Sequence, residues 1–478
     1  MSETISPDYL VIGSGAMGMA FVDTLLTDTK ATVAIVDKYA RPGGHWTISY
    51  PYVRLHQPSA FYGVNSRHLG EDKIDQFGFN KGMAELATVD EVCAYYSKVM
   101  HQTFLPSGRV AYYSRHEYLG DGTFRSILTH KVVRVGEGTR IVDATYMKVR
   151  VPAMSPPAYE VAKEVELITP NELPKVSRPY GGYTVVGAGK TGIDACLWLI
   201  ANGIDPRNIS WIMPRDAWLL DRRILQPGKE LAKQSAAMAA ASHEAIMMAS
   251  SAEDLFRRLE ACGYLMRLDD GMWPTMYKCA TVSMAELEQI RRIGTVIRQG
   301  RVLRLDADKI TLQNGTYDPV PDTLYIDCTA DALAKVTPTP VFSGNRITLQ
   351  SVRQCQQVFS AAFIGHVEAT YEDERLKNEL CRVVPHPSEP MDYLIANVQT
   401  QKNLLRWRAE PRTAAWLKQA RLDWFKKVHP PAPEDPAEAA EFYKMVEAIE
   451  RSTVKLEELL NQLPEQDAVR AKAQLARF

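Results

Sequence analysis

Two glycine-rich segments, residues 13–18 (GSGAMG) and residues 187–192 (GAGKTG), have a spacing suited to binding a nucleotide. Both fit the pattern GxGxxG. In this pattern the first glycine permits a tight turn, and the second lets the backbone approach a pyrophosphate. The third glycine allows the following helix to pack closely on the preceding strand. Each segment therefore predicts a dinucleotide site.

The residues around the first segment predict a βαβ unit. Residues 8–13 (DYLVIG) and 32–37 (TVAIVD) have the composition of buried strands, and residues 16–26 have helical spacing. Asp37 closes the second strand, where its carboxylate can accept hydrogen bonds from ribose hydroxyls. A carboxylate repels a 2′-phosphate, so this site suits FAD, whose adenosine ribose carries none. The predicted FAD contacts here are Gly13, Ser14, Gly15, Ala16, Met17, Gly18, Asp37 and Lys38.

The second segment lies in the same order of elements, with strands predicted at 183–187 and 209–213 and a helix at 193–202. Its GKT sequence is shared with P-loops, but Thr184 stands where that motif requires a glycine. Arg215 follows the second strand, and a guanidinium can bind a 2′-phosphate through charge-assisted hydrogen bonds. This site therefore suits NADPH, with Arg222 or Arg223 as a further cation. The predicted contacts are Gly187, Gly189, Lys190, Thr191, Gly192 and Arg215.

The composition is typical of a globular protein with several domains. The 478 residues suffice for two or three cores, and 46% are hydrophobic and 24% charged. A net charge of −1 argues against a nucleic-acid partner. No run approaches the roughly 18 apolar residues of a membrane span, and the N-terminus has no basic-then-apolar leader. We therefore expect a cytoplasmic enzyme without membrane contact.

The seven cysteines are scattered, and no two form a CxxC pair. This spacing predicts neither a zinc site nor a disulfide framework, and no metal is expected. It also lacks the dithiol motif that a disulfide reductase would require. Cys279 is accordingly interpreted as a lone thiol that contributes to packing.

The order of elements predicts an α/β fold with two Rossmann-like dinucleotide-binding domains, for FAD and NADPH, and a helical C-terminal extension. The first part of the FAD-binding domain is predicted at 1–170, and its return part at 321–387. The NAD(P)H-binding domain with a helical insert is predicted at 171–320, and the helical region at 388–478. One long Ala/Met-rich helix is expected over about residues 230–262.

Five further segments carry recognisable sequence: 43–46 (GGHW), 50–54 (YPYVR), 142–145 (VDAT), 326–329 (IDCT) and 211–218 (WIMPRDAW). Together with the two loops, they resemble the class B flavin monooxygenases, which comprise flavin-containing, Baeyer–Villiger and N-hydroxylating enzymes. In that superfamily the segment similar to GGHW lies beside the flavin, and the one similar to YPYVR leads toward the isoalloxazine. VDAT and IDCT look like the strand ends where such chains cross between domains. WIMPRDAW is similar to the strand-then-arginine segment for the 2′-phosphate.

The resemblance implies an NADPH-dependent FAD monooxygenase that oxygenates a small organic substrate with O2 through a C4a-(hydro)peroxyflavin, in secondary metabolism. Arg54 is expected to stabilise negative charge on the flavin. His56, Gln57 and Asn65 are expected to donate hydrogen bonds to the flavin or the nicotinamide. These four are the predicted catalytic residues. Further cofactor contacts are expected at Gly44, His45, Trp46, Arg54, Gln57, Thr145 and Thr329.

Two other functions stay open. An FAD/NAD(P)-dependent reductase or dehydrogenase would use the same loops without oxygenation, and the missing FxGxxxH sequence before the second loop favours it. A non-catalytic nucleotide sensor is the third function. It is favoured by Tyr146 and Ala330, which replace the glycines expected after Thr145 and Thr329. The sequence names no substrate, and a homodimer is one expected assembly.

Overall fold

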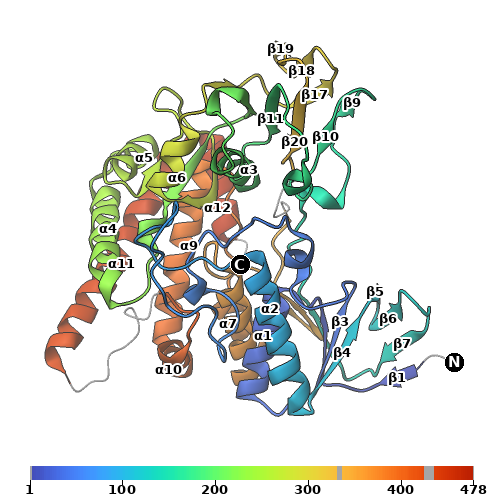
Figure 1. The fold of residues 1–478 in the computed structure, drawn as a ribbon. Coiled ribbons are helices and arrows are strands. Elements are labelled where there is room, and N and C mark those ends of the chain that lie inside the picture. The colour runs from blue at the N-terminus through green and yellow to red at the C-terminus, as the bar shows by residue number, and fades with distance from the viewer. Residues whose placement is uncertain (1–2, 331–335, 425–434, 477–478) are drawn as a thin grey trace.

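The computed structural model describes residues 3–330, 336–424 and 435–476 (Figure 1). Its first large sheet has the strand order β4-β3-β2-β8-β22-β21, in which only β21 is antiparallel. This order places β2 and its glycine loop at the centre of the sheet, as in a doubly wound fold. The strands are β2 (Tyr9–Ile12), β3 (Val33–Asp37), β4 (Val110–Ser114), β8 (Arg140–Asp143), β21 (Phe342–Ser343) and β22 (Arg346–Thr348).

The second large sheet repeats this plan with five parallel strands in the order β10-β20-β11-β12-β16. The helix α3 (Lys190–Ala201) connects β11 to β12 and packs against α6 (Met284–Ile290). The strands are β10 (Leu167–Ile168), β11 (Gly182–Val186), β12 (Ile209–Ile212), β16 (Thr295–Ile297) and β20 (Thr323–Asp327). The two sheets confirm the predicted pair of Rossmann-like units.

Three smaller sheets extend these units. The first lies beside the N-terminal sheet and contains β1 (Glu3–Ile5), β5 (His116–Gly120), β6 (Thr123–Ser126) and β7 (Val132–Val135). The second contains β9 (Glu160–Val161), β17 (Val302–Leu305), β18 (Ile310–Leu312) and β19 (Gly315–Tyr317). The third contains β13 (Ala217–Asp221), β14 (Leu265–Met266) and β15 (Met276–Val282).

Two helices of the first unit lie side by side and run in the same direction (Figure 1). They are α1 (Ala16–Asp28), which follows the first glycine loop, and α7 (Gln357–Thr370), which follows the return strand β22. Near their C-terminal ends His366 lies 3.6 Å from Asp28. A Cβ on Gly365 would lie 3.0 Å from the carbonyl oxygen of Phe21, so the two helices pack closely at this glycine. Both helices therefore begin at the edge of the sheet that carries the glycine loop.

The remaining helices join the two units. α9 packs against α11, α12 and β15, while α10 packs against α7 and α11 packs against α4 (Figure 1). None of the helices in the described ranges combines the length and apolar character needed to cross a membrane. The bounds are α2 (Val89–Val99), α4 (Lys229–Met248), α5 (Ala252–Ala261), α8 (Glu374–Leu380), α9 (Pro390–Ala409), α10 (Pro411–Gln419), α11 (Pro436–Asn461) and α12 (Glu465–Ala476).

The structure corrects two expectations about the elements. The single helix expected over 230–262 is two helices, α4 and α5, because Ser250 and Ser251 end the first and cap the second. The Ser251 hydroxyl accepts a hydrogen bond from the Asp254 amide at 3.1 Å. The predicted domain boundaries at 170 and 321 also shift, since β9, β10 and β20 all pair with strands of the second unit.

The third glycine of the first loop yields a stability prediction. A Cβ on Gly18 would lie 2.1 Å from the carbonyl oxygen of Gly13, so Gly18→Ala must displace backbone. We expect a loss of about 1–3 kcal/mol of stability, seen as a lower melting temperature. Gly138→Ala is the matched control, because its Cβ would meet no atom within 4 Å. Equal melting temperatures for the two variants would contradict the packing described here.

Candidate functional site

The first glycine loop has the conformation that a bound diphosphate requires. Gly13 has a φ of +102°, which L side chains rarely adopt, and Gly15 starts the turn into α1. The first amides of a helix have no acceptor inside it and carry the positive end of its dipole. The predicted residues Ala16 and Met17 open this helix, directly after Ser14. The loop therefore presents backbone donors to an anion at the edge of the sheet.

Asp37 lies buried at the end of β3 and faces this loop. Its Oδ2 accepts hydrogen bonds from the amide and the hydroxyl of Ser14, both at 2.6 Å, and its Oδ1 accepts one from the Tyr39 amide at 2.8 Å. A carboxylate has about four acceptor positions, so one remains for a ribose hydroxyl. Rotation of the Ser14 hydroxyl would free a second. The neighbouring Lys38 is exposed and lies over the ring of Tyr39.

The GGHW segment packs directly on the first loop. The Gly43 amide donates to the carbonyl oxygen of Ser14 at 2.9 Å, and a Cβ on Gly44 would lie 2.8 Å from the Cα of Gly15. His45 stacks on Trp46, with ring centroids 5.4 Å apart. Burial lowers the pKa of His45 to about 4, so its ring is neutral near pH 7. The structure thus brings Gly44, His45 and Trp46 to the first loop.

Thr145 and Thr329 occupy equivalent positions in the two units. Each lies two residues after an aspartate that ends a strand, and each donates to that aspartate through its amide and its hydroxyl. A Cβ on Gly13 would lie 3.0 Å from Cγ2 of Thr145, while a Cβ on Gly187 would lie 2.6 Å from the carbonyl oxygen of Cys328. These two strand ends therefore form one wall of each glycine loop.

The second loop repeats the constraints of the first but leaves more room at its centre. Gly187 has a φ of +127°, and a Cβ on Gly192 would lie 2.2 Å from the carbonyl oxygen of Gly187. By contrast, a Cβ on Gly189 would meet no atom within 4 Å. This open space at the start of α3 is where a pyrophosphate would approach the backbone. Thr191 is half-buried in the first turn of α3.

Lys190 connects the second loop to the first unit. Its ammonium pairs with Asp194 one turn along α3, and the other oxygen of Asp194 accepts a hydrogen bond from the hydroxyl of Tyr50 at 2.7 Å. Tyr52 packs between Tyr50 and Trp198 of α3, with ring centroids 4.7 and 5.5 Å apart. The YPYVR segment therefore lies at the junction of the two units and fixes the first loop relative to the second.

Arg215 is exposed immediately after β12, and no carboxylate in the described parts of the chain pairs with it. Its guanidinium can therefore meet a 2′-phosphate. The alternative cations do not fit this role. Arg222 is fully buried and binds Glu286 at 2.7 Å, while Arg223 pairs with Asp221. The expectation that one of these two provides a further cation is wrong, because internal acceptors hold both guanidinium groups.

The four predicted catalytic residues do not form one cluster. Arg54 is exposed, and its backbone bridges to Thr88. Asn65 accepts a hydrogen bond from the Leu422 amide at 3.1 Å, so its side chain helps to hold the C-terminal region. His56 and Gln57 are half-buried. Catalytic roles for all four stay predictions.

His56 is the member of this set that contacts the second unit. Its Nδ1 accepts a hydrogen bond from the Thr281 amide at 3.4 Å, and its carbonyl oxygen accepts one from Nε of Arg222 at 3.2 Å. Burial, with smaller effects from the charges of Lys190 and Arg222, lowers the pKa of His56 to about 3. Because Lys190 begins α3, a neutral imidazole lies near the second loop.

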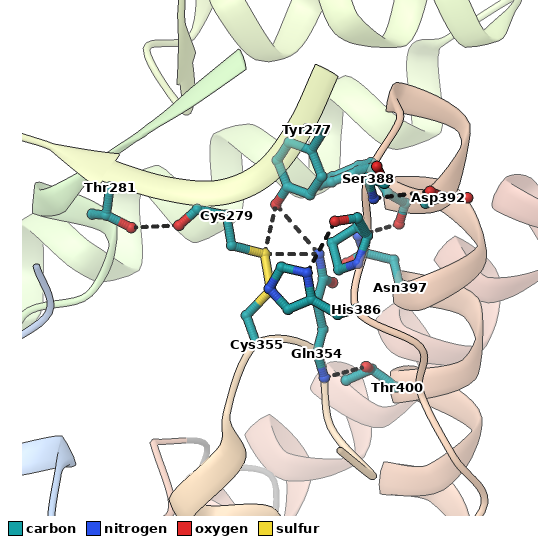
Figure 2. The surroundings of a disulfide bond; sticks show 12 residues. Tyr277, Cys279, Thr281, Gln354, Cys355, His386, Ser388, Asp392, Asn397 and Thr400 are labelled. Carbon is teal, nitrogen blue, oxygen red and sulfur yellow. Dashed lines mark hydrogen bonds between the residues drawn. A yellow bond between two sulfur atoms is a disulfide. The ribbon is translucent and has the colours of Figure 1, made fainter. Parts of the chain in front are cut away.

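A disulfide bond joins Cys279 of β15 to Cys355, which lies just before α7 (Figure 2). The interpretation of Cys279 as a lone thiol is therefore wrong. The two cysteines are 76 residues apart, so no local motif marks the pair. Tyr277, Gln354 and His386 surround the bond in Figure 2. The hydroxyl oxygen of Tyr277 lies 3.8 Å, and Nε2 of Gln354 4.0 Å, from Sγ of Cys279.

A cavity of about 170 Å³ adjoins the disulfide, at the meeting point of the return strand, the segment 383–388 and the helices α9 and α12. The side-chain oxygens of Ser351 and Ser388 are buried there without a hydrogen-bond partner among the described residues. Burial lowers the pKa of His386 to about 4. Sequence reasoning missed this region, although the prolines on either side of His386 mark a rigid segment. The polar lining includes Gln350, Ser351, His386, Ser388 and Arg470.

The half-buried His56 yields a pH prediction. Its folded pKa of about 3 lies below the unfolded value of about 6.5, so between these values the unfolded chain binds more protons. Stability should therefore fall as the pH decreases from about 6.5 toward about 4. In His56→Gln this loss should be smaller, by up to about 1.4 kcal/mol per pH unit. Melting curves across this range check it, with the exposed His101→Gln as control. Identical profiles for both variants would contradict a neutral His56.

Comparisons with known proteins give relatives that match most of the chain. No family model matches the chain. The Uncharacterized protein Rv2000 of Mycobacterium tuberculosis and the Uncharacterized protein Mb2023 of Mycobacterium bovis are each 51% identical to it over 436 residues. The matched region covers 91% of this chain and 81% of each relative.

Solved structures show only remote likenesses. A flavin-containing monooxygenase from Stenotrophomonas maltophilia is 13% identical with a TM-score of 0.42, covering 79% of this chain and 99% of its own. A steroid monooxygenase bound to NADP is 14% identical with a TM-score of 0.48, covering 93% and 98%. A cyclohexanone monooxygenase from Rhodococcus sp. Phi1 is 14% identical with a TM-score of 0.45, covering 77% and 84%.

Structural likeness at this level supports no inference about activity, whereas 51% identity over nine-tenths of the chain establishes common descent. The chain belongs to the same protein family as the mycobacterial proteins Rv2000 and Mb2023.

Proposed function

We propose that this protein is an FAD- and NADPH-dependent oxidoreductase, and specifically a monooxygenase that acts on a small organic substrate. The observation that carries the proposal is the pair of GxGxxG loops. Both lie at the carboxyl edge of a parallel sheet. Asp37 follows the first loop, and Arg215, which has no carboxylate partner among the described residues, follows the second. Ligands of such sheets bind at this edge.

The first site fits FAD. Gly13 and Gly18 have the conformation and packing that a diphosphate-binding turn needs, and Asp37 retains acceptor capacity for a ribose. GGHW packs against the loop with a neutral histidine and a buried tryptophan. These residues would hold the adenosine diphosphate half and border the flavin ring. When bound, FAD would accept a hydride from NADPH and pass its electrons to dioxygen.

The second site fits NADPH. Gly189 leaves open space at the start of α3, and the exposed Arg215 meets the requirement for a cation at the 2′-phosphate. The Tyr50–Asp194 hydrogen bond holds α3 against the segment that follows GGHW. This contact would orient the nicotinamide relative to the flavin, which hydride transfer requires.

The cavity beside the disulfide is the proposed substrate site. Its volume of about 170 Å³ suits a small molecule. Its mixture of aliphatic side chains, buried serine hydroxyls and a neutral His386 would exclude water and donate or accept hydrogen bonds. The chemical class of the substrate follows from none of these features, and a role in secondary metabolism stays a proposal.

A reductase or dehydrogenase is the second candidate, and the observation that favours it is the disulfide. A disulfide at the junction of two nucleotide units is an electron acceptor other than oxygen. The sensor hypothesis receives no comparable support. Tyr146 stands where the resemblance predicts a glycine. Its hydroxyl donates a hydrogen bond to the carbonyl oxygen of Thr337, in the segment that leads back to the first sheet.

The reaction with oxygen tests the proposed function. Purified protein containing FAD should lose its flavin absorbance when NADPH is added without oxygen, and regain it when oxygen enters. The protein, NADPH and 18O2 are then incubated with a panel of ketones, sulfides and amines. A monooxygenase should give a product that carries one 18O atom. Reduction by NADPH without label in any product would favour the reductase. A flavin that NADPH does not reduce would contradict both enzymes.

Two variants test the NADPH site. Arg215→Ala should weaken NADPH binding by about ten- to a hundredfold and leave the affinity for NADH nearly unchanged. This factor corresponds to the loss of a charge-assisted hydrogen bond of about 1.5–3 kcal/mol. Gly189→Ala should weaken both nucleotides without lowering the melting temperature, because its Cβ occupies open space. Gly294→Ala, also in open space, is the control for folding. An unchanged NADPH:NADH preference in Arg215→Ala would contradict the assignment.

A further inference from the structure

The disulfide between Cys279 and Cys355 joins the two nucleotide-binding units covalently. Cys279 belongs to β15, which pairs with β13 in the extension of the second unit. Cys355 follows the return strand β22 of the first unit and stands two residues before α7. Since the sulfurs come from different units, the bond lies at their junction.

This position is the same edge of the first sheet that carries the FAD loop. α7 runs parallel to α1, and the two helices begin at that edge. Cys355 precedes the first turn of α7, just as the glycine loop precedes α1. Dinucleotides bind at the carboxyl edge of such sheets. Cys355 therefore lies on the side of the first unit that faces a bound flavin.

The other sulfur is connected to the second glycine loop. Thr281, two residues after Cys279, donates its amide to His56 at 3.4 Å, and its hydroxyl donates to the carbonyl oxygen of Cys279 at 3.2 Å. The charge of Lys190, the first residue of α3, acts on the same His56. The disulfide is thus linked through Thr281 and His56 to the surroundings of the second loop, and it lies at the junction of the two nucleotide-binding units.

The surroundings of the bond suit a change of redox state. The hydroxyl of Tyr277 and the amide of Gln354 lie near Sγ of Cys279, and His386 lies beside the pair in Figure 2. These groups can hydrogen-bond a sulfur that gains charge or a proton. Cys279 and Cys355 have φ values of 55° and 54°, a left-handed conformation that few non-glycine residues adopt. Cys355 is half-buried, whereas Cys279 is buried.

From this placement we propose that Cys279 and Cys355 form a two-electron redox centre that NADPH reduces through the flavin, an inference that rests on the proposed function. In this step the S–S bond breaks and two S–H bonds form. NADPH supplies two electrons and one proton as a hydride, solvent supplies the second proton, and NADP+ is released. The flavin starts and ends oxidised, so atoms and electrons balance.

The test is a thiol count after anaerobic reduction. Oxidised, FAD-containing protein is titrated with NADPH, quenched with an alkylating reagent and digested for mass spectrometry. We expect alkylation of Cys279 and Cys355 only after NADPH is added, and uptake of two NADPH per flavin. The Cys279→Ser variant, which cannot form the disulfide, should take up one NADPH per flavin. Cys262→Ser, which removes a half-buried free cysteine of the second unit, should still take up two.

Two results would overturn the proposal. In one, NADPH reduces the flavin but the peptides of Cys279 and Cys355 stay linked. In the other, the two peptides are never linked after oxidation. Both are measured on the unaltered chain, so a variant that fails to fold does not affect them. If NADPH leaves the flavin oxidised, the proposed function fails instead. Photochemical reduction of the flavin then tests electron transfer to the disulfide separately. If the disulfide between Cys279 and Cys355 is still intact after the flavin is reduced, the proposed redox centre is contradicted.

Discussion

Two carbonyl oxygens, those of Gly13 and Gly187, set the constraint on which the structure depends. A Cβ on Gly18 would lie 2.1 Å from the first of these oxygens, and a Cβ on Gly192 would lie 2.2 Å from the second. The helix that follows can approach the strand only because that side chain is missing. This close approach sets the position of α1 and α3, and with them the amides at the edge of each sheet. The residues that flank the two loops differ. Asp37 is buried beside the first loop, whereas Arg215 is exposed to solvent beside the second.

The chemistry that we propose belongs to neither unit alone. The links that cross the junction include the hydrogen bond between Tyr50 and Asp194, the one between Thr281 and His56, and the disulfide between Cys279 and Cys355. The C-terminal region holds the first unit's side of the junction. Arg421 donates hydrogen bonds to the carbonyl oxygens of Tyr62 and Val64, in the segment that follows His56. Burial lowers the pKa of His56 and His386 near this junction, and of His45 beside the first loop, so that all three rings are neutral near pH 7. A neutral, dry and fixed environment is what hydride transfer between two nucleotides requires.

Local patterns predicted the parts of the molecule that depend on local rules. Both βαβ units follow from glycine spacing and apolar runs, and the structure places GGHW and Thr145 beside the first loop, while the cofactor contacts predicted for these residues and for Thr329 stay predictions. The parts that depend on long-range contacts were not predictable in this way. Cys279 and Cys355 are 76 residues apart, and Asn65 meets Leu422 across 357 residues. Asn65 supports the C-terminal region by accepting a hydrogen bond from the backbone amide of Leu422, and no local sequence pattern predicts that contact. Arg222 looked like a surface cation, yet Glu286 and Asn80 bury it.

The return of the chain to the first sheet has a consequence for synthesis on the ribosome. Asp143 of β8 pairs with Arg346 of β22, and 203 residues separate them. At about 5–20 residues per second, this interval lasts roughly 10–40 s. During that time β8 is an open edge and the apolar face of α1 is uncovered, because α7 does not yet exist. The whole second unit is made within this interval. The N-terminal half of the nascent chain therefore stays incomplete until the later unit has emerged, and folding cannot proceed strictly in the order of translation.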